Sequence, residues 1–135
     1  MSMPIGEIKG LPQGLEVKLK EIGVHNADEL LAKCATPKAR KEFAASLALD
    51  PKVLLEIANR ADLSRITGVA GVFSDLLENA GVDTVKELAG RVPENLHAKL
   101  AEVNAAHKIS ARTPTVDQVT AWIEEAKKLP KVLEY

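Results

Sequence analysis

The strongest constraint on the fold is an internal repeat: shifted by 58 positions, the segment from residue 8 matches the segment from residue 66. Seven of the 24 residue pairs from 8/66 to 31/89 are identical, where unrelated sequences would share about one or two. No Ser/Gly-rich or charged linker separates the copies. We therefore expect a first repeat over 1–64 and a second over 65–131, packed into one compact body and followed by a tail over 132–135.

Helix-capping residues and prolines predict about four helices in each repeat. The stretch 13–22 places Leu15, Leu19 and Ile22 on one face and closes at Gly23, which suits a left-handed cap. Three further helices of the first repeat begin at Asn26, Thr36-Pro37 and Asp50-Pro51. In the second repeat, helices are expected near 70–80, 84–91, 93–107 and 115–129. Since no window alternates convincingly in hydrophobicity over strand length, the predicted fold class is all-α.

Each repeat begins with a pattern that resembles the helix-hairpin-helix motif. The first copy reads Ile8-Lys-Gly10-Leu11 before a helix ending in Ile22-Gly23-Val24, and the second reads Ile66-Thr-Gly68-Val69 before one ending in Ala80-Gly81-Val82. Together with the segments 36–41, 59–63 and 93–96, these patterns are similar to a bacterial family of duplicated helix-hairpin-helix proteins of unassigned function. The resemblance covers nearly the whole chain and implies two tandem helix-hairpin-helix units.

The hairpin turns are candidate phosphate contacts. In DNA-binding members of the wider hairpin class, a Gly-hydrophobe-Gly turn directs backbone N–H groups at a phosphate. The corresponding candidates here are Gly10, Leu11, Gly14, Gly68, Val69 and Gly71. The second glycine of the turn is replaced by Pro12, which has no N–H group, and by Ala70, which adds a side chain where a phosphate would approach. Hairpins that only pack helices are therefore favoured over phosphate clamps.

Charge leaves nucleic-acid binding open in one segment. The net charge of -1 provides no bulk attraction to nucleic acid or to an anionic membrane. Residues 33–65, however, contain seven basic and four acidic side chains. The candidate basic patch in this segment comprises Lys33, Lys38, Arg40, Lys41, Arg60 and Arg65. It either binds a DNA or RNA backbone without sequence preference or forms an ordinary solvated helix face, which is the favoured interpretation.

The sequence contains no recognisable catalytic or metal-binding motif. Cys34 and the three histidines lack the spacings of zinc sites, and no nucleophile or dinucleotide pattern occurs. We expect no enzymatic activity, cofactor, metal or small-molecule substrate. Cys34 follows Lys33 at a predicted helix end, where a thiolate is disfavoured, so it is expected to be a small buried packing residue.

Trp122 and Tyr135 are the candidate interface residues. Trp122 neighbours the inward stripe of the last helix, so it either seals the core or anchors a partner. The tail ending in Tyr135 either docks on the body or reaches a partner. A single cysteine and the lack of a long apolar run favour a cytoplasmic protein without membrane contact. The favoured function is a non-catalytic binding or adaptor module for an unidentified protein or a second copy of itself, with nucleic-acid binding as the alternative.

Overall fold

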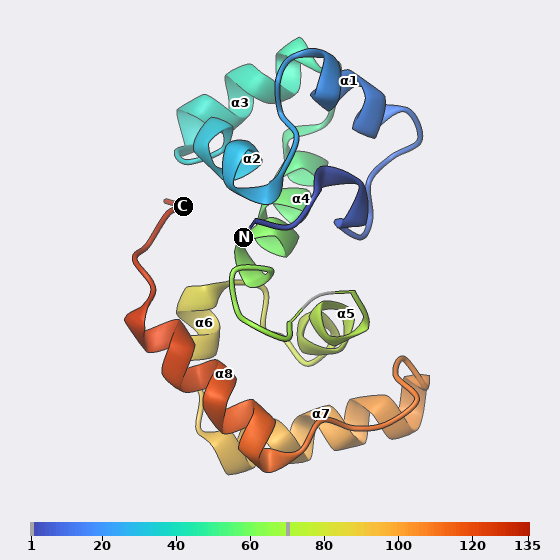
Figure 1. Cartoon of the computed structure of the whole chain (residues 1–135), viewed down its shortest axis with the longest axis vertical. Coiled ribbons are helices and arrows are strands. Elements are labelled where there is room, and N and C mark those ends of the chain that lie inside the picture. Colours follow the sequence, from blue (N-terminus) through green and yellow to red (C-terminus); the bar gives the residue numbers. More distant parts are fainter. Residues whose placement is uncertain (1, 70) are drawn as a thin grey trace.

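The computed structural model describes residues 2–69 and 71–135, which are helical apart from turns and connecting segments (Figure 1). A short 3-10 helix, Ile5–Glu7, comes first. The eight α-helices in this described part are α1 (Leu15–Glu21), α2 (Ala27–Lys33), α3 (Pro37–Ser46), α4 (Pro51–Leu63), α5 (Val72–Asn79), α6 (Val85–Ala89), α7 (Pro93–His107) and α8 (Val116–Lys128). No strand occurs in the same residues. The predicted all-α class is therefore confirmed.

Side-chain caps explain where most of these helices begin. Five helices start after a residue whose side-chain oxygen accepts a hydrogen bond from a backbone N–H of the first turn. The acceptors are Asn26, Thr36, Asp50, Thr84 and Thr115, at 2.9, 3.1, 2.9, 3.1 and 3.1 Å. Such bonds satisfy N–H groups that a helix cannot pair internally. Because the caps are local, the sequence alone predicted these starts to within a few residues.

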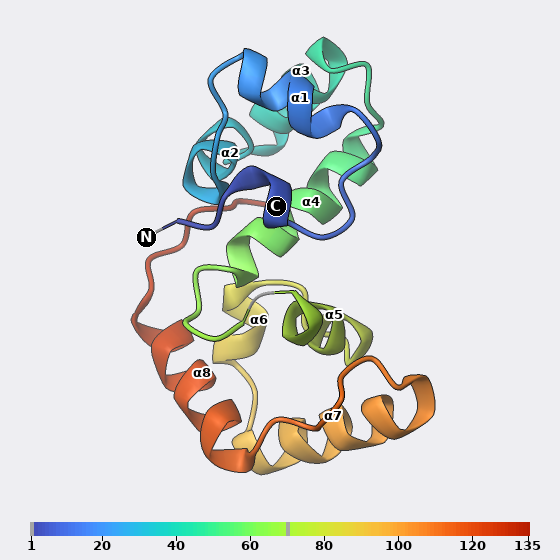
Figure 2. The same ribbon diagram turned by 45° about the vertical axis from the view of Figure 1, so that its right-hand side comes forward.

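The buried apolar side chains form two clusters that share no residue. The first cluster lies in the upper half of the molecule in Figures 1 and 2, among the 3-10 helix and α1–α4. The second lies in the lower half, among α5–α8. Helix α4 contributes to both, because Ala61 belongs to the first cluster and Leu63 to the second. The two halves are thus joined by one continuous helix rather than by a common core.

Some positions aligned by the 58-residue shift have similar backbone conformation or burial. Gly23 and Gly81 both have left-handed backbones, with φ of 87° and 89°, so the cap predicted at Gly23 is confirmed. Leu19 and Leu77 are both fully buried. The prediction for Ile22 is wrong, since this side chain is 52% exposed. Ile22 is the C-cap of α1 with φ -99° and ψ 12°, so it no longer follows the inward stripe of the helix.

The C-terminal tail crosses from the second half to the first. From the end of α8 it runs back to the first half and ends near α2 and α4 (Figures 1 and 2). Leu133 is 3% exposed and belongs to the first cluster. The backbone N–H of Glu134 donates to the carbonyl of Ala35 at 2.8 Å, and Tyr135 Oη donates to Asn59 Oδ1 at 2.8 Å. Of the two alternatives for the tail, docking on the body is the one observed.

Two leucine truncations should separate helix packing from tail docking. Leu54→Ala within α4 should lower the free energy of unfolding by about 2–5 kcal/mol, because the surrounding helices cannot close the cavity. Leu133→Ala should lower it by only about 1 kcal/mol, because an undocked tail recovers conformational entropy that offsets the lost burial. Urea denaturation followed by circular dichroism measures both values. Equal losses would contradict this prediction and make the tail a rigid part of the first cluster.

Candidate binding cleft between the two halves

The candidate phosphate contacts lie in the turns before α1 and α5. The φ angles of Gly10, Gly14, Gly68 and Gly71 are 86°, 84°, 85° and 55°. Gly14 and Gly71 are the N-caps of the two helices, and neither makes a side-chain cap. Leu11 is half-buried and Val69 is buried, so both hydrophobic residues of the turns pack toward the interior. Ala70, the substituted glycine of the second turn, lies outside the described residues.

An ion cluster connects the first half to α5. Arg60 of α4 contacts both Asp75 and Glu78, and Lys9 Nζ lies 3.3 Å from Asp75 Oδ2. Burial works against the charge of Arg60, but the hydrogen bond to Asp75 and the contacts with Glu78 outweigh it and raise the pKa of Arg60. Lys9 beside the first turn and Arg60 of the candidate basic patch therefore both form ion pairs with carboxylates of α5.

The remaining residues of the candidate basic patch differ in exposure. Arg40 is only 6% exposed, its Nη1 donates to the carbonyl of Cys34 at 2.8 Å, and its guanidinium lies 5.5 Å from the ring centroid of Tyr135. The three lysines of the patch, Lys33, Lys38 and Lys41, are exposed on α2 and α3. In Figure 1, the start of α3 lies on the left of the first half and the loop before α1 on the right. The exposed part of the patch on these helices therefore consists of three lysines.

Asp62 is a buried carboxylate at the junction of the two halves. It is 4% exposed in the last turn of α4. Its Oδ2 accepts from the backbone N–H of Val85 at 2.9 Å, and its Oδ1 accepts from Arg65 Nη1 at 2.8 Å. Arg65 Nη2 in turn donates to the carbonyl of Pro130 at 2.6 Å. One carboxylate and one guanidinium therefore connect α4, the start of α6 and the segment after α8, and each satisfies the buried polar groups of the other.

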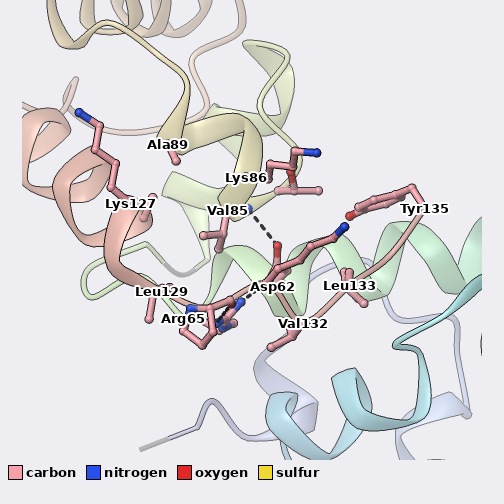
Figure 3. Close-up of a pocket in the computed structure, with 14 residues that line it drawn as sticks. Asp62, Arg65, Val85, Lys86, Ala89, Lys127, Leu129, Val132, Leu133 and Tyr135 are labelled. Atoms are coloured by element: carbon pink, nitrogen blue, oxygen red, sulfur yellow. Dashed lines mark hydrogen bonds and ion pairs between the residues drawn. The ribbon is translucent and has the colours of Figure 1, made fainter.

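A cleft of about 230 Å³ opens beside this junction, between α6, α8 and the tail (Figure 3). Its apolar lining is formed by Val85, Ala89, Ala126, Leu129, Val132 and Leu133. Lys86, Lys127 and Lys131 also line it. Figure 3 shows Lys127 and Tyr135 at opposite ends of this inter-half cleft. An apolar lining with cationic residues suits a ligand that is partly apolar and partly anionic.

Two of the three cleft lysines are not engaged by carboxylates. Within residues 2–69 and 71–135, no ion pair involves Lys86 or Lys131, while Lys127 Nζ lies 3.4 Å from Glu124 Oε1 in an exposed pair. A neighbouring hollow of about 400 Å³ shares Lys86 and Tyr135 with the cleft and adds Arg91. Glu87 also lines this hollow, so its lining carries both signs of charge.

The candidate interface residues have different environments. Trp122 is 4% exposed and packs against Phe73 in the second cluster, with ring centroids 5.4 Å apart. Of the two interpretations of Trp122, sealing the core is the one observed, because the indole is enclosed by the chain's own helices. Tyr135 is 59% exposed and lines the inter-half cleft.

The sequence contains one local indication of the buried carboxylate at the junction. Asp62 follows Ala58 by four residues on the inward face of its helix, where a polar residue requires a partner.

Neither a membrane span nor a metal cluster is found in the described ranges. No helix there is long and apolar enough to cross a membrane. No three side chains of His, Cys, Asp and Glu gather there closely enough to share a metal ion.

Cys34 should be unreactive in the folded chain. It is fully buried, and burial raises the pKa of its thiol from 9.0 to about 12, with Arg40 only partly opposing the shift. Since only the thiolate attacks, the folded protein should react with a disulfide reagent at pH 8 at least roughly a hundredfold more slowly than the urea-unfolded chain. Absorbance of the released chromophore measures both rates. Comparable rates would show that the thiol is accessible.

Loss of Asp62 should destabilise the chain more than loss of an exposed capping aspartate. Asp62→Ala should lower the free energy of unfolding by about 3 kcal/mol, because it leaves the guanidinium of Arg65 and the N–H of Val85 without their acceptor. The matched control, Asp50→Ala, removes only the cap of α4 and should lower it by about 1 kcal/mol. Urea denaturation of the two variants provides the comparison. A loss at Asp62 no larger than at Asp50 would contradict the proposed role of this carboxylate at the junction.

Comparison with known proteins identifies a family but no activity. A family model described as "Domain of unknown function (DUF4332)" matches residues 9–129. The match includes all of α1–α8 and ends before the C-terminal tail. No solved structure matches the chain. Because the match extends over most of the sequence, the chain belongs to the DUF4332 family of domains of unknown function.

Proposed function

We propose that this chain is a non-catalytic binding module built from two tandem helix-hairpin-helix units, as in the bacterial duplicated proteins that its sequence resembles. The similar φ angles of Gly10 and Gly68, 86° and 85°, support the duplication. So do the caps Asn26 and Thr84, which occupy aligned positions and make equivalent hydrogen bonds. In this proposal the hairpins pack helices, and the binding surface lies where the two units meet.

The main support for this function is the presence of the inter-half cleft. Its volume of about 230 Å³ is below the roughly 300–1,000 Å³ typical of small-molecule sites, so it suits side chains of a larger partner. Apolar groups such as Val85 and Leu129 would supply affinity, while Lys86, Lys127 and Lys131 would attract and orient negative charge. The partner is accordingly an acidic, partly apolar segment of another protein.

The alternative is binding of a DNA or RNA backbone. Fewer basic side chains support it than the six residues of the candidate basic patch. Arg40, Arg60 and Arg65 all make hydrogen bonds or ion pairs within the chain. A phosphate contact by any of them would have to replace an internal partner. The exposed lysines of α2 and α3 remain available, and they are the basis on which this alternative is tested.

Two matched triple variants distinguish the hypotheses. Lys86→Gln, Lys127→Gln and Lys131→Gln together remove the charge of the cleft, while Lys33→Gln, Lys38→Gln and Lys41→Gln remove the same charge from α2 and α3. Fluorescence anisotropy would follow a labelled peptide of Glu-Glu-Leu repeats and a labelled DNA duplex, at low and physiological salt. We expect the cleft variant to bind the peptide about tenfold more weakly, since three exposed charge pairs are lost, and the α2–α3 variant to bind it unchanged.

Two outcomes would redirect this proposal. Tight duplex binding that weakens steeply with salt and is lost in the α2–α3 variant would make the chain a nucleic-acid protein. Light scattering on the same samples tests self-association. A concentration-dependent dimer that the cleft variant abolishes would make a second copy of the chain the partner.

A further inference from the structure

We propose a second binding site: a groove of the first half that takes an extended peptide segment of a protein partner, and that the chain's own C-terminal tail occupies in cis. The groove is formed by α2, α4 and the turn after α2, together with Arg40 of α3. Lys86 and Lys127 of the inter-half cleft take no part in it, although the tail that fills the groove also lines that cleft. In this proposal the tail occupies the groove as a bound peptide would.

The tail is bound in the manner of an extended peptide. Leu133 is inserted into the first cluster. The next residue, Glu134, is exposed but donates its backbone N–H to the carbonyl of Ala35 at 2.8 Å. The following residue, Tyr135, again faces the groove, where its hydroxyl donates to Asn59 Oδ1 at 2.8 Å. Main-chain hydrogen bonding combined with pockets for alternate side chains is how proteins recognise extended segments.

The contacts of the groove define the chemistry of its ligand. The site of Leu133 is enclosed by apolar side chains, so it selects a branched aliphatic group. The guanidinium of Arg40 lies 5.5 Å from the ring centroid of Tyr135, an arrangement that favours an aromatic ring by cation–π attraction. Asn59 accepts from the phenolic hydroxyl. The preferred segment is therefore leucine, any exposed residue, then tyrosine.

Several observations indicate that the tail can leave. It forms no helix, and of its residues 132–135 only Leu133 is buried. Val132 borders the inter-half cleft on one side and a second hollow of about 330 Å³ on the other, which is lined by Leu31 and Ala35. A segment that buries one side chain and is otherwise held by a few exposed contacts belongs to the least stable part of a structure.

The family match supports the distinction between groove and occupant. Residues 9–129 match the family model, and they include the whole of α2, α3 and α4. The tail lies outside that match. The helices that form the groove therefore lie within the matched residues, and the segment that fills it lies outside them.

A labelled peptide with the sequence of residues 130–135 tests the groove on the full-length chain. In wild type the tail competes at a high effective concentration, so the peptide should bind weakly. Leu133→Asp places a carboxylate in the apolar site and should release the tail. We expect the peptide to bind this variant at least tenfold more tightly than wild type in fluorescence anisotropy. The same peptide carrying Leu133→Ala and Tyr135→Ala should bind neither protein.

Further variants keep the test decisive. Circular dichroism melting establishes whether each variant is folded. If Leu133→Asp is unfolded, Tyr135→Ala replaces it in the test, because this substitution removes only the exposed ring. The expected gain in peptide affinity is then smaller. Lys86→Gln with Lys127→Gln should leave peptide binding unchanged, and this separates the groove from the inter-half cleft. Equal binding to wild type and to folded tail variants, or binding to none of them, would overturn the proposal. Wild-type dimers that Leu133→Asp abolishes would also overturn it, by making the tail of a second copy the occupant.

Discussion

The arrangement of the two halves depends on the buried carboxylate of Asp62. The two hydrophobic clusters share no residue, so apart from Leu133 of the tail, burial of apolar surface holds each half together without fixing one against the other. Asp62 accepts from Val85 at the start of α6 and from Arg65, and Arg65 donates to the carbonyl of Pro130. These bonds are directional and unscreened, because Asp62 is 4% exposed. They place α6, α8 and the tail around the end of α4, and the inter-half cleft is the space that remains.

Arginine and lysine side chains have different environments in this structure, although each adds one positive charge to the net charge. Arg40, Arg60 and Arg65 all bind acceptors within the chain, whereas the lysines of the same segment are exposed. The guanidinium explains this difference, since its planar set of donors can bind two acceptors at once and is more weakly hydrated than an ammonium group. Arg65 does so with Asp62 and Pro130. A basic segment rich in arginine is therefore a weaker indication of nucleic-acid binding than its net charge implies.

The features that the sequence predicted well depend on residues that are close together in the chain. Capping residues such as Thr36 and Thr115 act within one helical turn, so helix boundaries followed from neighbouring residues. Trp122 was ambiguous because its burial depends on Phe73, far away in the sequence. The cleft could not be predicted, since Lys86 and Lys131 line the same cleft only after α6, α8 and the tail have packed. Asp62 is the exception, because a charged residue on the inward face of a helix indicates a buried partner.

The tail links the two proposed sites. Val132, Leu133 and Tyr135 form a wall of the inter-half cleft, and Leu133 and Tyr135 also fill the groove of the first half. A partner that takes the groove therefore removes a wall of the cleft, while a ligand that contacts this wall in the cleft stabilises the docked tail. By linkage, each ligand weakens the binding of the other by the same factor. Such coupling requires no movement between the halves, because the bonds from Asp62 to Val85 and Arg65 lie outside the segment that is exchanged. An adaptor built in this way would release one partner as it accepts another.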